Sequence, residues 1–355
     1  MTRTTLIFPS SMGASLAQAR TLMARGERVV AASSVAADET AQHYPHWHPL
    51  PSIYDAGFAD ALAALIAQQH ITDIYTPHAV VHAVIARVLA ERGLQVQLPE
   101  QSPLAALDAG YRTLLAETEG ALAFARAIAP SLTQDTVAMA SLLHQSQAIY
   151  GQTSESKLAA MAACFATAPR GDVVEIGTAW GRSAFALCML AQHYDTGAVL
   201  AIDPWNEGVA SQKDSPDALE QVNQQIDWEM MHRIFLIHLL PMRGRFNYRR
   251  MLSVPASADY AAGLMVESPH FGRTAYAGRV ALIHIDGNHD YASVAADVGA
   301  WLPKLLPGGW LVLDDYVWEH GDGPRRVGDA LLAEQAARVA HSFTCGKALF
   351  VQFAA

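Results

Sequence analysis

The sequence lacks the features of a secreted, metal-cluster or membrane protein. Its three cysteines, Cys164, Cys188 and Cys345, lie far apart and form no C-x-x-C pair. Such an odd, scattered set excludes a disulfide framework and a zinc cluster, and it fits a reducing cytoplasm. No segment approaches the roughly 18 consecutive apolar residues that span a bilayer, and residues 1–15 hold only the short apolar run 6–8. We therefore expect a cytoplasmic protein without a membrane partner.

Positive charge is also scarce. Lysine and arginine number 24 against 34 aspartates and glutamates, which gives a formal net charge of −10. A nucleic-acid partner is disfavoured, because phosphate backbones are bound by basic surfaces. The 355 residues are 51% hydrophobic and 16% charged, which is too apolar for a disordered chain. Since typical domains contain about 100–200 residues, we expect two globular domains.

Residues 1–102 alternate short β-prone runs with helical patterns. Two of the helical patterns end at Gly26 and Gly93, as is common at a helix C-terminus. The sequence predicts a small α/β domain with a parallel sheet over residues 1–102. Residues 103–150 contain two Ala-rich helical patterns, which we interpret as a helical connector. The strands expected in the first domain are residues 5–8, 28–33, 73–76 and 94–98.

A second and longer alternation fills residues 151–355. Apolar runs predict strands, and amphipathic segments between them predict helices. This order favours an α/β fold with a doubly wound, Rossmann-like sheet that carries helices on both faces. The last two β-prone runs flank Cys345-Gly346-Lys347 and predict a closing antiparallel hairpin. The strands expected in this domain are residues 172–176, 198–202, 280–285, 309–313, 338–344 and 348–353.

The residues after these strands are the first candidates for a ligand site, because open α/β sheets bind ligands outside the carboxyl ends of their strands. Gly177 and Gly181 follow the first strand and open a helix, so backbone N–H groups there can approach a ligand. Asp203 follows the next strand, where a carboxylate can accept both hydroxyls of a ribose. A plain tight turn, with Asp203 capping it, is the simpler alternative. The dinucleotide fingerprint G-x-G-x-x-G fails, because its second and third glycines fall on Ala179 and Arg182.

Acidic residues follow two later strands. Asp286 ends one strand, His289 lies three positions further on, and Asp314 and Asp315 end the next strand. Three carboxylates at one sheet edge need a counter-charge, and a divalent ion such as Mg²⁺ suits oxygen ligands of this kind. The alternative is that these aspartates cap helices or are solvated, and that His289 is an ordinary surface or core histidine.

Four segments carry a family resemblance, and they are residues 173–187, 201–205, 284–291 and 307–316. In their order along the chain they resemble the class I S-adenosylmethionine-dependent methyltransferases. Within that superfamily they are similar to the bacterial group that includes the macrocin, mycinamicin and rhamnosyl O-methyltransferases. One departure is Ala179, which replaces the central glycine of the commonest cofactor loop. A methyl group at that position is tolerable if the backbone keeps an ordinary φ.

The resemblance implies S-adenosylmethionine as the cofactor, with the glycine turn around its methionine part and Asp203 on its ribose. In the metal-dependent sugar methyltransferases of this group, residues at the places of Asp286, Asp314 and Asp315 bind Mg²⁺. A histidine at the place of His289 acts there as the base. The cofactor-binding residues expected here are Glu175, Gly177, Thr178, Gly181, Ser183, Asp203 and Asp286.

The expected function is therefore Mg²⁺-assisted methyl transfer to a hydroxyl of a sugar or another small polar metabolite. A metal-independent O- or N-methyltransferase and a non-catalytic protein that binds S-adenosylmethionine are the alternatives. Aromatic residues that follow strands are candidates to wall a substrate pocket, although such residues are also common at the rim of a core. They are Trp205, Tyr291, Tyr316 and Trp318.

The first domain resembles the nucleotide-fold domain that precedes ATP-grasp catalytic domains, although no ATP-grasp domain follows it. In related sugar methyltransferases an N-terminal domain assists oligomerisation and covers the active site. We therefore expect a homo-oligomer. The sequence identifies neither the methyl acceptor nor the adenine-binding residues within 206–279.

Overall fold

The computed structural model describes residues 3–35, 37–212 and 216–355. It contains two compact units, Met1–Thr113 and Leu114–Ala355, and the boundary between them falls inside the long helix α4 (Pro103–Ile128). Each unit has its own sheet and its own core. Within the described residues, no helix combines the length and the apolar character needed to cross a bilayer.

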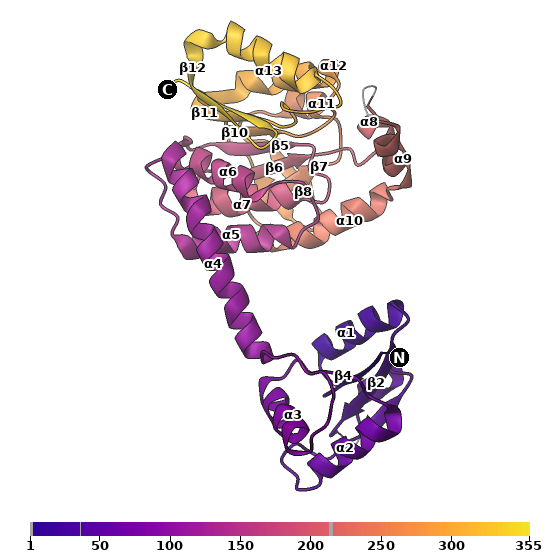
Figure 1. Ribbon diagram of the computed structural model, residues 1–355. Helices are drawn as coiled ribbons and strands as arrows, with labels where there is room; N and C mark the ends of the chain where they lie inside the picture. The colour runs from indigo at the N-terminus through magenta and orange to yellow at the C-terminus, as the bar shows by residue number, and fades with distance from the viewer. Residues whose placement is uncertain (1–2, 36, 213–215) are drawn as a thin grey trace. The chain divides into compact units, whose positions relative to one another are not determined.

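The first unit, drawn in indigo and purple in Figure 1, is built on a parallel sheet. Its four strands have the order β3-β2-β1-β4. Strand β1 pairs with both β2 and β4, and its neighbouring residues Leu6 and Ile7 are fully buried in two different cores. This alternation follows from the period of two in a strand. The elements are β1 (Thr4–Ile7), α1 (Gly13–Ala24), β2 (Arg28–Ser33), β3 (Trp47–Pro49), α2 (Phe58–Gln69), β4 (Asp73–Tyr75) and α3 (Ala79–Glu91).

The prediction of a strand at residues 94–98 is wrong. Among the described residues, this segment reaches the sheet only through an isolated bridge between Asp73 and Gln97. Gln97 accepts a hydrogen bond from Ile74 N and donates one to Thr72 O. The rest of the segment therefore runs as irregular chain beside β4.

The second unit is built on a seven-stranded sheet in the order β12-β13-β11-β10-β5-β6-β7. All neighbours from β11 to β7 pair in parallel, whereas β13 is antiparallel to both β11 and β12. This confirms the predicted α/β fold and its closing hairpin. The strands are β5 (Asp172–Ile176), β6 (Val199–Ile202), β7 (Phe246–Arg249), β10 (Val280–Ile285), β11 (Leu305–Leu313), β12 (Val339–Cys345) and β13 (Ala348–Phe353).

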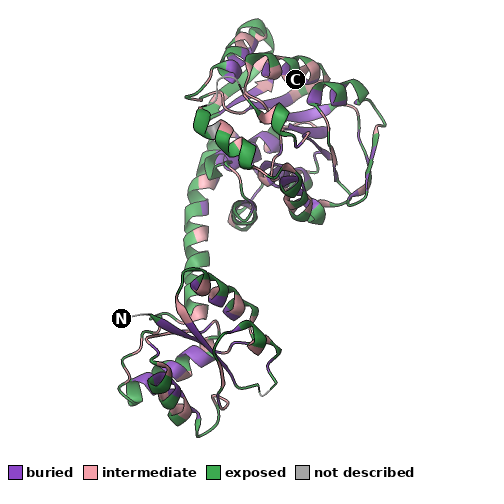
Figure 2. Ribbon diagram, turned by 90° about the vertical axis from the view of Figure 1, so that its right-hand side faces the viewer, coloured by how far each residue is buried: buried purple, intermediate pink, exposed green. Residues whose placement is uncertain are grey.

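Helices cover both faces of this sheet, and the buried strands of Figure 2 lie between two cores. Val173 of β5 packs into the core with α5, α6 and α7, whereas the next residue, Val174, packs into the core with α11, α12 and α13. Strands buried on both faces need continuous apolar runs, which is what the sequence has. The helices of this unit after α4 are α5 (Thr136–Gln147), α6 (Glu155–Thr167), α7 (Arg182–Tyr194), α8 (Glu207–Ala210), α9 (Asp217–Gln225), α10 (Trp228–Leu239), α11 (Ser253–Asp259), α12 (Tyr291–Trp301) and α13 (Gly323–Glu334).

The edge strand β7 and the small hairpin of β8 (Met265–Ser268) and β9 (Gly272–Ala275) were not predicted from the sequence. Strand β7 has only four residues, and two of them, Asn247 and Arg249, are polar. Asn247 is nevertheless fully buried, because its side-chain amide donates to the carbonyls of Val266 and Gly272. A hydrogen-bonded polar side chain therefore replaces the apolar signal that sequence patterns detect.

We predict that Phe350→Ala strongly destabilises the second unit. Phe350 is fully buried in β13 and stacks on Phe343 with ring centroids 4.8 Å apart. Its truncation removes this contact and leaves a cavity, so unfolding in urea should require about 3–5 kcal/mol less free energy. Ile237→Ala, at a side chain 69% exposed on α10, is the matched control. It should change stability by less than about 0.5 kcal/mol, and equal losses in the two variants would contradict the assigned core.

Candidate functional site

The carboxyl ends of the central strands meet at one edge of the large sheet and carry the predicted site residues. The ladder continues one residue beyond each strand. Gly177 N donates to the last carbonyl of β6 at 2.9 Å, Asp286 N to that of β5 at 2.8 Å, and Asp314 N to that of β10 at 2.9 Å. These bonds hold the three residues side by side at the level where this fold class binds ligands.

The turn from β5 into α7 requires glycine at two positions. Gly177 has φ +76°, and a Cβ there would lie 2.2 Å from the carbonyl oxygen of Asp286. Gly181, the N-cap of α7, has φ +91°, and a Cβ would lie 2.5 Å from a leucine methyl of α10. Thr178 and Ser183 are buried beside them, and Thr178 Oγ1 has no hydrogen-bond partner among the described residues. The turn thus brings backbone and a free hydroxyl to the sheet edge.

Asp203 holds this turn from the neighbouring strand. Its Oδ2 accepts the N–H groups of Thr178 at 2.9 Å and Ala179 at 3.0 Å, and its Oδ1 accepts Trp205 N at 2.7 Å. Burial raises the pKa of Asp203, and these three N–H donors oppose that rise. Trp205, only 2% exposed, donates its indole N–H to Ala179 O. Trp205 is therefore part of the support of the turn and not a pocket wall.

Ala179 does not keep an ordinary backbone conformation, so the condition for tolerating its methyl group is not met. Its φ is +46°, in the left-handed region. That region costs a residue with a Cβ roughly 1–2 kcal/mol. Ala179 is held there by two hydrogen bonds, one that its N–H donates to Asp203 and one that its carbonyl accepts from the Trp205 indole. The turn therefore has a backbone conformation that suits glycine at position 179, and the alanine there is strained.

A fully buried, hydrogen-bonded pair of side chains lies behind the turn. Glu175 of β5 and His284 of β10 stand directly opposite each other, with Oε1 and Nδ1 3.0 Å apart. Oε2 of Glu175 has no partner among the described residues. His284 was not among the predicted residues. Its signal in the sequence is a single polar residue in the apolar run 280–285.

Lys157 is the second residue that sequence reasoning missed. It lies in the first turn of α6, its side chain is 5% exposed, and Nζ donates a hydrogen bond to Asp314 Oδ2. Nζ also lies 3.7 Å from Asp286 Oδ2. The sequence signal is weak, because Lys157 merely opens an apolar run at 158–165. The counter-charge that the aspartates require is thus supplied in part by the chain itself.

These contacts shift the pKa values of the cluster in different directions. Burial and the Asp314 carboxylate raise the pKa of Asp286 to about 7. Burial also opposes ionisation of Asp314, but the Lys157 ammonium and His284 hold the pKa of Asp314 well below its usual range. Burial lowers the pKa of Lys157, yet the carboxylates of Asp286 and Asp314 outweigh it and raise that pKa. Lys157 and Asp314 are therefore a firmly charged pair.

His289 pairs with the other carboxylate of the double aspartate. Its Nε2 lies 2.8 Å from Asp315 Oδ2, whereas its Nδ1 is buried without a partner among the described residues. Burial lowers the pKa of His289, but the hydrogen bond and charge of Asp315 raise it above the ordinary value. The Trp318 ring packs edge-on against the imidazole, with centroids 5.9 Å apart. The histidine therefore has one nitrogen anchored and one open to a proton.

Potential metal-ligand atoms form two groups, and the atoms within each group all lie within 4.8 Å of one another. The inner group is His284, Asp286 and Asp314, and the outer group is Asp286, His289 and Asp315. His284 is fully buried and Asp314 is hydrogen-bonded to Lys157, so the inner group has little room for an ion. The outer group offers two partly exposed carboxylates and an imidazole, which fits a hard divalent ion that keeps several waters.

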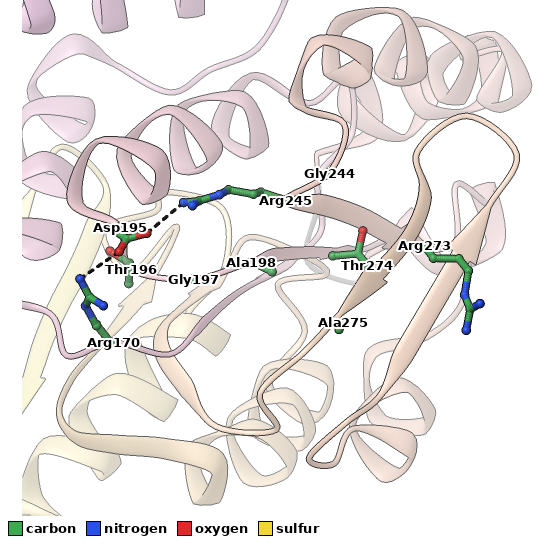
Figure 3. A pocket seen from close by; sticks show the side chains of 10 residues that line it. All are labelled: Arg170, Asp195, Thr196, Gly197, Ala198, Gly244, Arg245, Arg273, Thr274 and Ala275. Carbon is green, nitrogen blue, oxygen red and sulfur yellow. Dashed lines mark hydrogen bonds and ion pairs between the residues drawn. The ribbon is translucent and has the colours of Figure 1, made fainter.

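A cavity of about 460 Å³ lies elsewhere, at the amino ends of the strands (Figure 3). Arg170 and Arg245 line it, but both pair with Asp195, at 2.9 and 3.1 Å. Figure 3 shows Arg273 extending away from that pair. The cavity therefore has no set of convergent free groups, and it lies at the opposite edge from the predicted residues.

Comparison with known proteins gives one family match. Residues 174–316 match the model of a family described as a methyltransferase domain, and this stretch contains every predicted site residue. No curated protein sequence matches the chain at a significant level.

Several solved structures show a general likeness. The O-methyltransferase NovP is 16% identical over 69% of this chain and 99% of its own, with a TM-score of 0.42. An O-methyltransferase from Bacillus cereus, in complex with SAH, is 17% identical over 67% and 100% of the two chains, with a TM-score of 0.36. MycE methyltransferase from the mycinamycin biosynthetic pathway, in complex with Mg and SAH, is 11% identical over 60% and 54%, with a TM-score of 0.36.

We predict that Ala179→Gly stabilises the second unit. Glycine adopts the φ of +46° without strain, and part of that gain is lost to a freer unfolded chain, so the net increase should be up to about 1 kcal/mol. Urea unfolding measures it. Ala123→Gly, at an exposed position in the middle of α4, is the control with the opposite sign and should cost about 1 kcal/mol. Destabilisation of the same size in both variants would show that position 179 is not strained.

Proposed function

We propose that the second unit is a class I methyltransferase domain that acts as an S-adenosylmethionine-dependent O-methyltransferase. The match of residues 174–316 to a methyltransferase domain and the antiparallel strand inserted in the sheet support this proposal. The acceptor is a hydroxyl of a sugar or of another small polar metabolite. One observation carries the proposal. The strained glycine turn and the His289–Asp315 pair lie at the same edge of one sheet, so a cofactor on the first would face a base on the second.

The cofactor would be held by the turn between β5 and α7. Gly177 and Gly181 permit close approach to the backbone, and the N-terminus of α7 contributes free N–H groups. Thr178 Oγ1 is a buried hydroxyl that still needs a partner. Asp203 already accepts three backbone N–H groups, so its first role is to fix this turn, and its contact with a ribose stays a prediction. Contacts of Glu175, Ser183 and Asp286 with the cofactor also stay predictions.

His289 is the residue to which we assign the acceptor proton. With Nε2 donating to Asp315, the neutral imidazole keeps Nδ1 as an acceptor, and that atom has no competing partner among the described residues. Asp315 also favours the protonated imidazole, which is the form that His289 reaches once it holds the proton. General-base assistance of this kind is typically worth about 10²–10⁴ in rate.

The outer group would hold Mg²⁺ through Asp286 and Asp315, with Asp314 next to them on the same edge. A bound dication would lower the pKa of the acceptor hydroxyl and fix its direction. Lys157 favours the metal-independent alternative, since its ammonium already balances one carboxylate. A cofactor-binding protein without catalysis would bind S-adenosylmethionine and show no turnover. Homo-oligomerisation, a cytoplasmic location and the role of residues 1–102 stay predictions.

We predict that removal of divalent ions slows methyl transfer at least tenfold. After treatment with EDTA, turnover of radiolabelled S-adenosylmethionine with a metabolite extract should fall, because the hydroxyl loses the dication that lowers its pKa. Addition of Mg²⁺ should restore the rate. A full rate in the metal-free protein would remove the metal from the proposed function and leave methyl transfer itself intact.

We also predict that His289→Ala lowers kcat by about 10²–10⁴ while binding of S-adenosylmethionine is retained. Isothermal titration with the cofactor measures binding, and methyl transfer measures kcat. His270→Ala, at an exposed histidine outside the site, is the matched control and should leave both unchanged. Normal turnover in His289→Ala would exclude this histidine as the base.

A further inference from the structure

Lys157 lies on a helix, not on a strand or a loop after a strand, and its side chain reaches the carboxylate cluster. It belongs to α6, which precedes β5, and Asp314 lies 157 positions later in the sequence. The N-cap Ser154 accepts the N–H of Lys157, so the start of the helix is fixed. The lysine side chain is 5% exposed, and it therefore sits inside the second unit and not in solvent.

The ammonium of Lys157 lies against two oxygens of the inner group. Nζ hydrogen-bonds to Oδ2 of Asp314 and is 3.7 Å from Oδ2 of Asp286. His284 Nε2 lies 3.8 and 3.9 Å from the same two oxygens. Oδ2 of Asp314 and Oδ2 of Asp286 therefore both face a cation that belongs to the chain. A buried ammonium without such partners would be very costly, so this contact is not incidental.

We infer that Lys157 is the resident counter-cation of Asp286 and Asp314 and competes with a divalent ion for these carboxylates. The inference rests on the proposed function only in taking the same cluster as the metal site. A dication on Oδ2 of Asp314 would meet the ammonium at hydrogen-bond distance, and like charges so close repel strongly. A metal is thus confined to the outer group, and Asp286 is the one ligand for which the two cations compete.

Binding of Mn²⁺, followed by its electron paramagnetic resonance signal, tests this inference without any need for turnover. Lys157→Gln removes the competing charge at similar size. We expect Lys157→Gln to bind Mn²⁺ at least tenfold more tightly than the wild type. Lys304→Gln is the matched control, because Lys304 lies just before β11, at the other end of that strand, and it should bind like the wild type. Equal or weaker binding by Lys157→Gln would overturn the inference.

A second pair of variants keeps the inference testable if Lys157→Gln does not fold. Lys157→Met, which removes the charge at similar length, should bind Mn²⁺ at least tenfold more tightly than the wild type, whereas Lys157→Arg, which keeps the charge, should stay within threefold of it. Equal affinities in these two variants would overturn the inference. If wild type binds no Mn²⁺ and Lys157→Gln does, the inference holds and the metal leaves the proposed function. If neither the wild type nor Lys157→Gln binds Mn²⁺, the inference about Lys157 and the proposed metal site are both wrong. Methyl transfer is tested separately, with the labelled cofactor.

Discussion

Parallel pairing at the centre of the seven-stranded sheet is the constraint on which the site depends. In a parallel sheet all carboxyl ends lie at one edge, and here the backbone ladder extends one residue past β5, β10 and β11. Gly177, Asp286 and Asp314 are donors of these last hydrogen bonds. Their positions are therefore set by the same interaction that holds the core together. A shift of register in any of these strands would separate the glycine turn from the carboxylates.

The supports of the site come from the layers around this edge. Asp203 and Trp205 brace the glycine turn from β6, and the side chain of Lys157 reaches the aspartates from a helix that packs on one face. Both supports are buried polar groups whose hydrogen bonds are largely satisfied, which makes them costly to rearrange. The strained φ of Ala179 and the buried charge of Lys157 are tolerated because the surrounding structure fixes them.

Sequence reasoning predicted most strands of the large sheet and its closing hairpin. It succeeded where a strand has a clear apolar pattern of its own. Strand β6 is a continuous apolar run, β10 is interrupted only by His284, and the hairpin of β12 and β13 flanks a glycine. It failed for β7, where the side-chain amide of Asn247 replaces apolar packing. It also failed for residues 94–98, since their apolar pattern is that of a strand, but only Gln97 pairs with β4.

The difference between local and long-range information also explains which site residues could be predicted. Asp286, Asp314 and Asp315 could be found because position after a strand is a local property, and their need for a counter-charge followed from electrostatics alone. The identity of that counter-charge could not be found, because it depends on which helix packs over the edge. Lys157 makes the inner half of the cluster close to neutral, while Asp315 shares its charge with His289 at the more exposed outer half. Each half of the cluster thus has its own basic partner from the chain, Lys157 from a helix and His289 from the loop after β10.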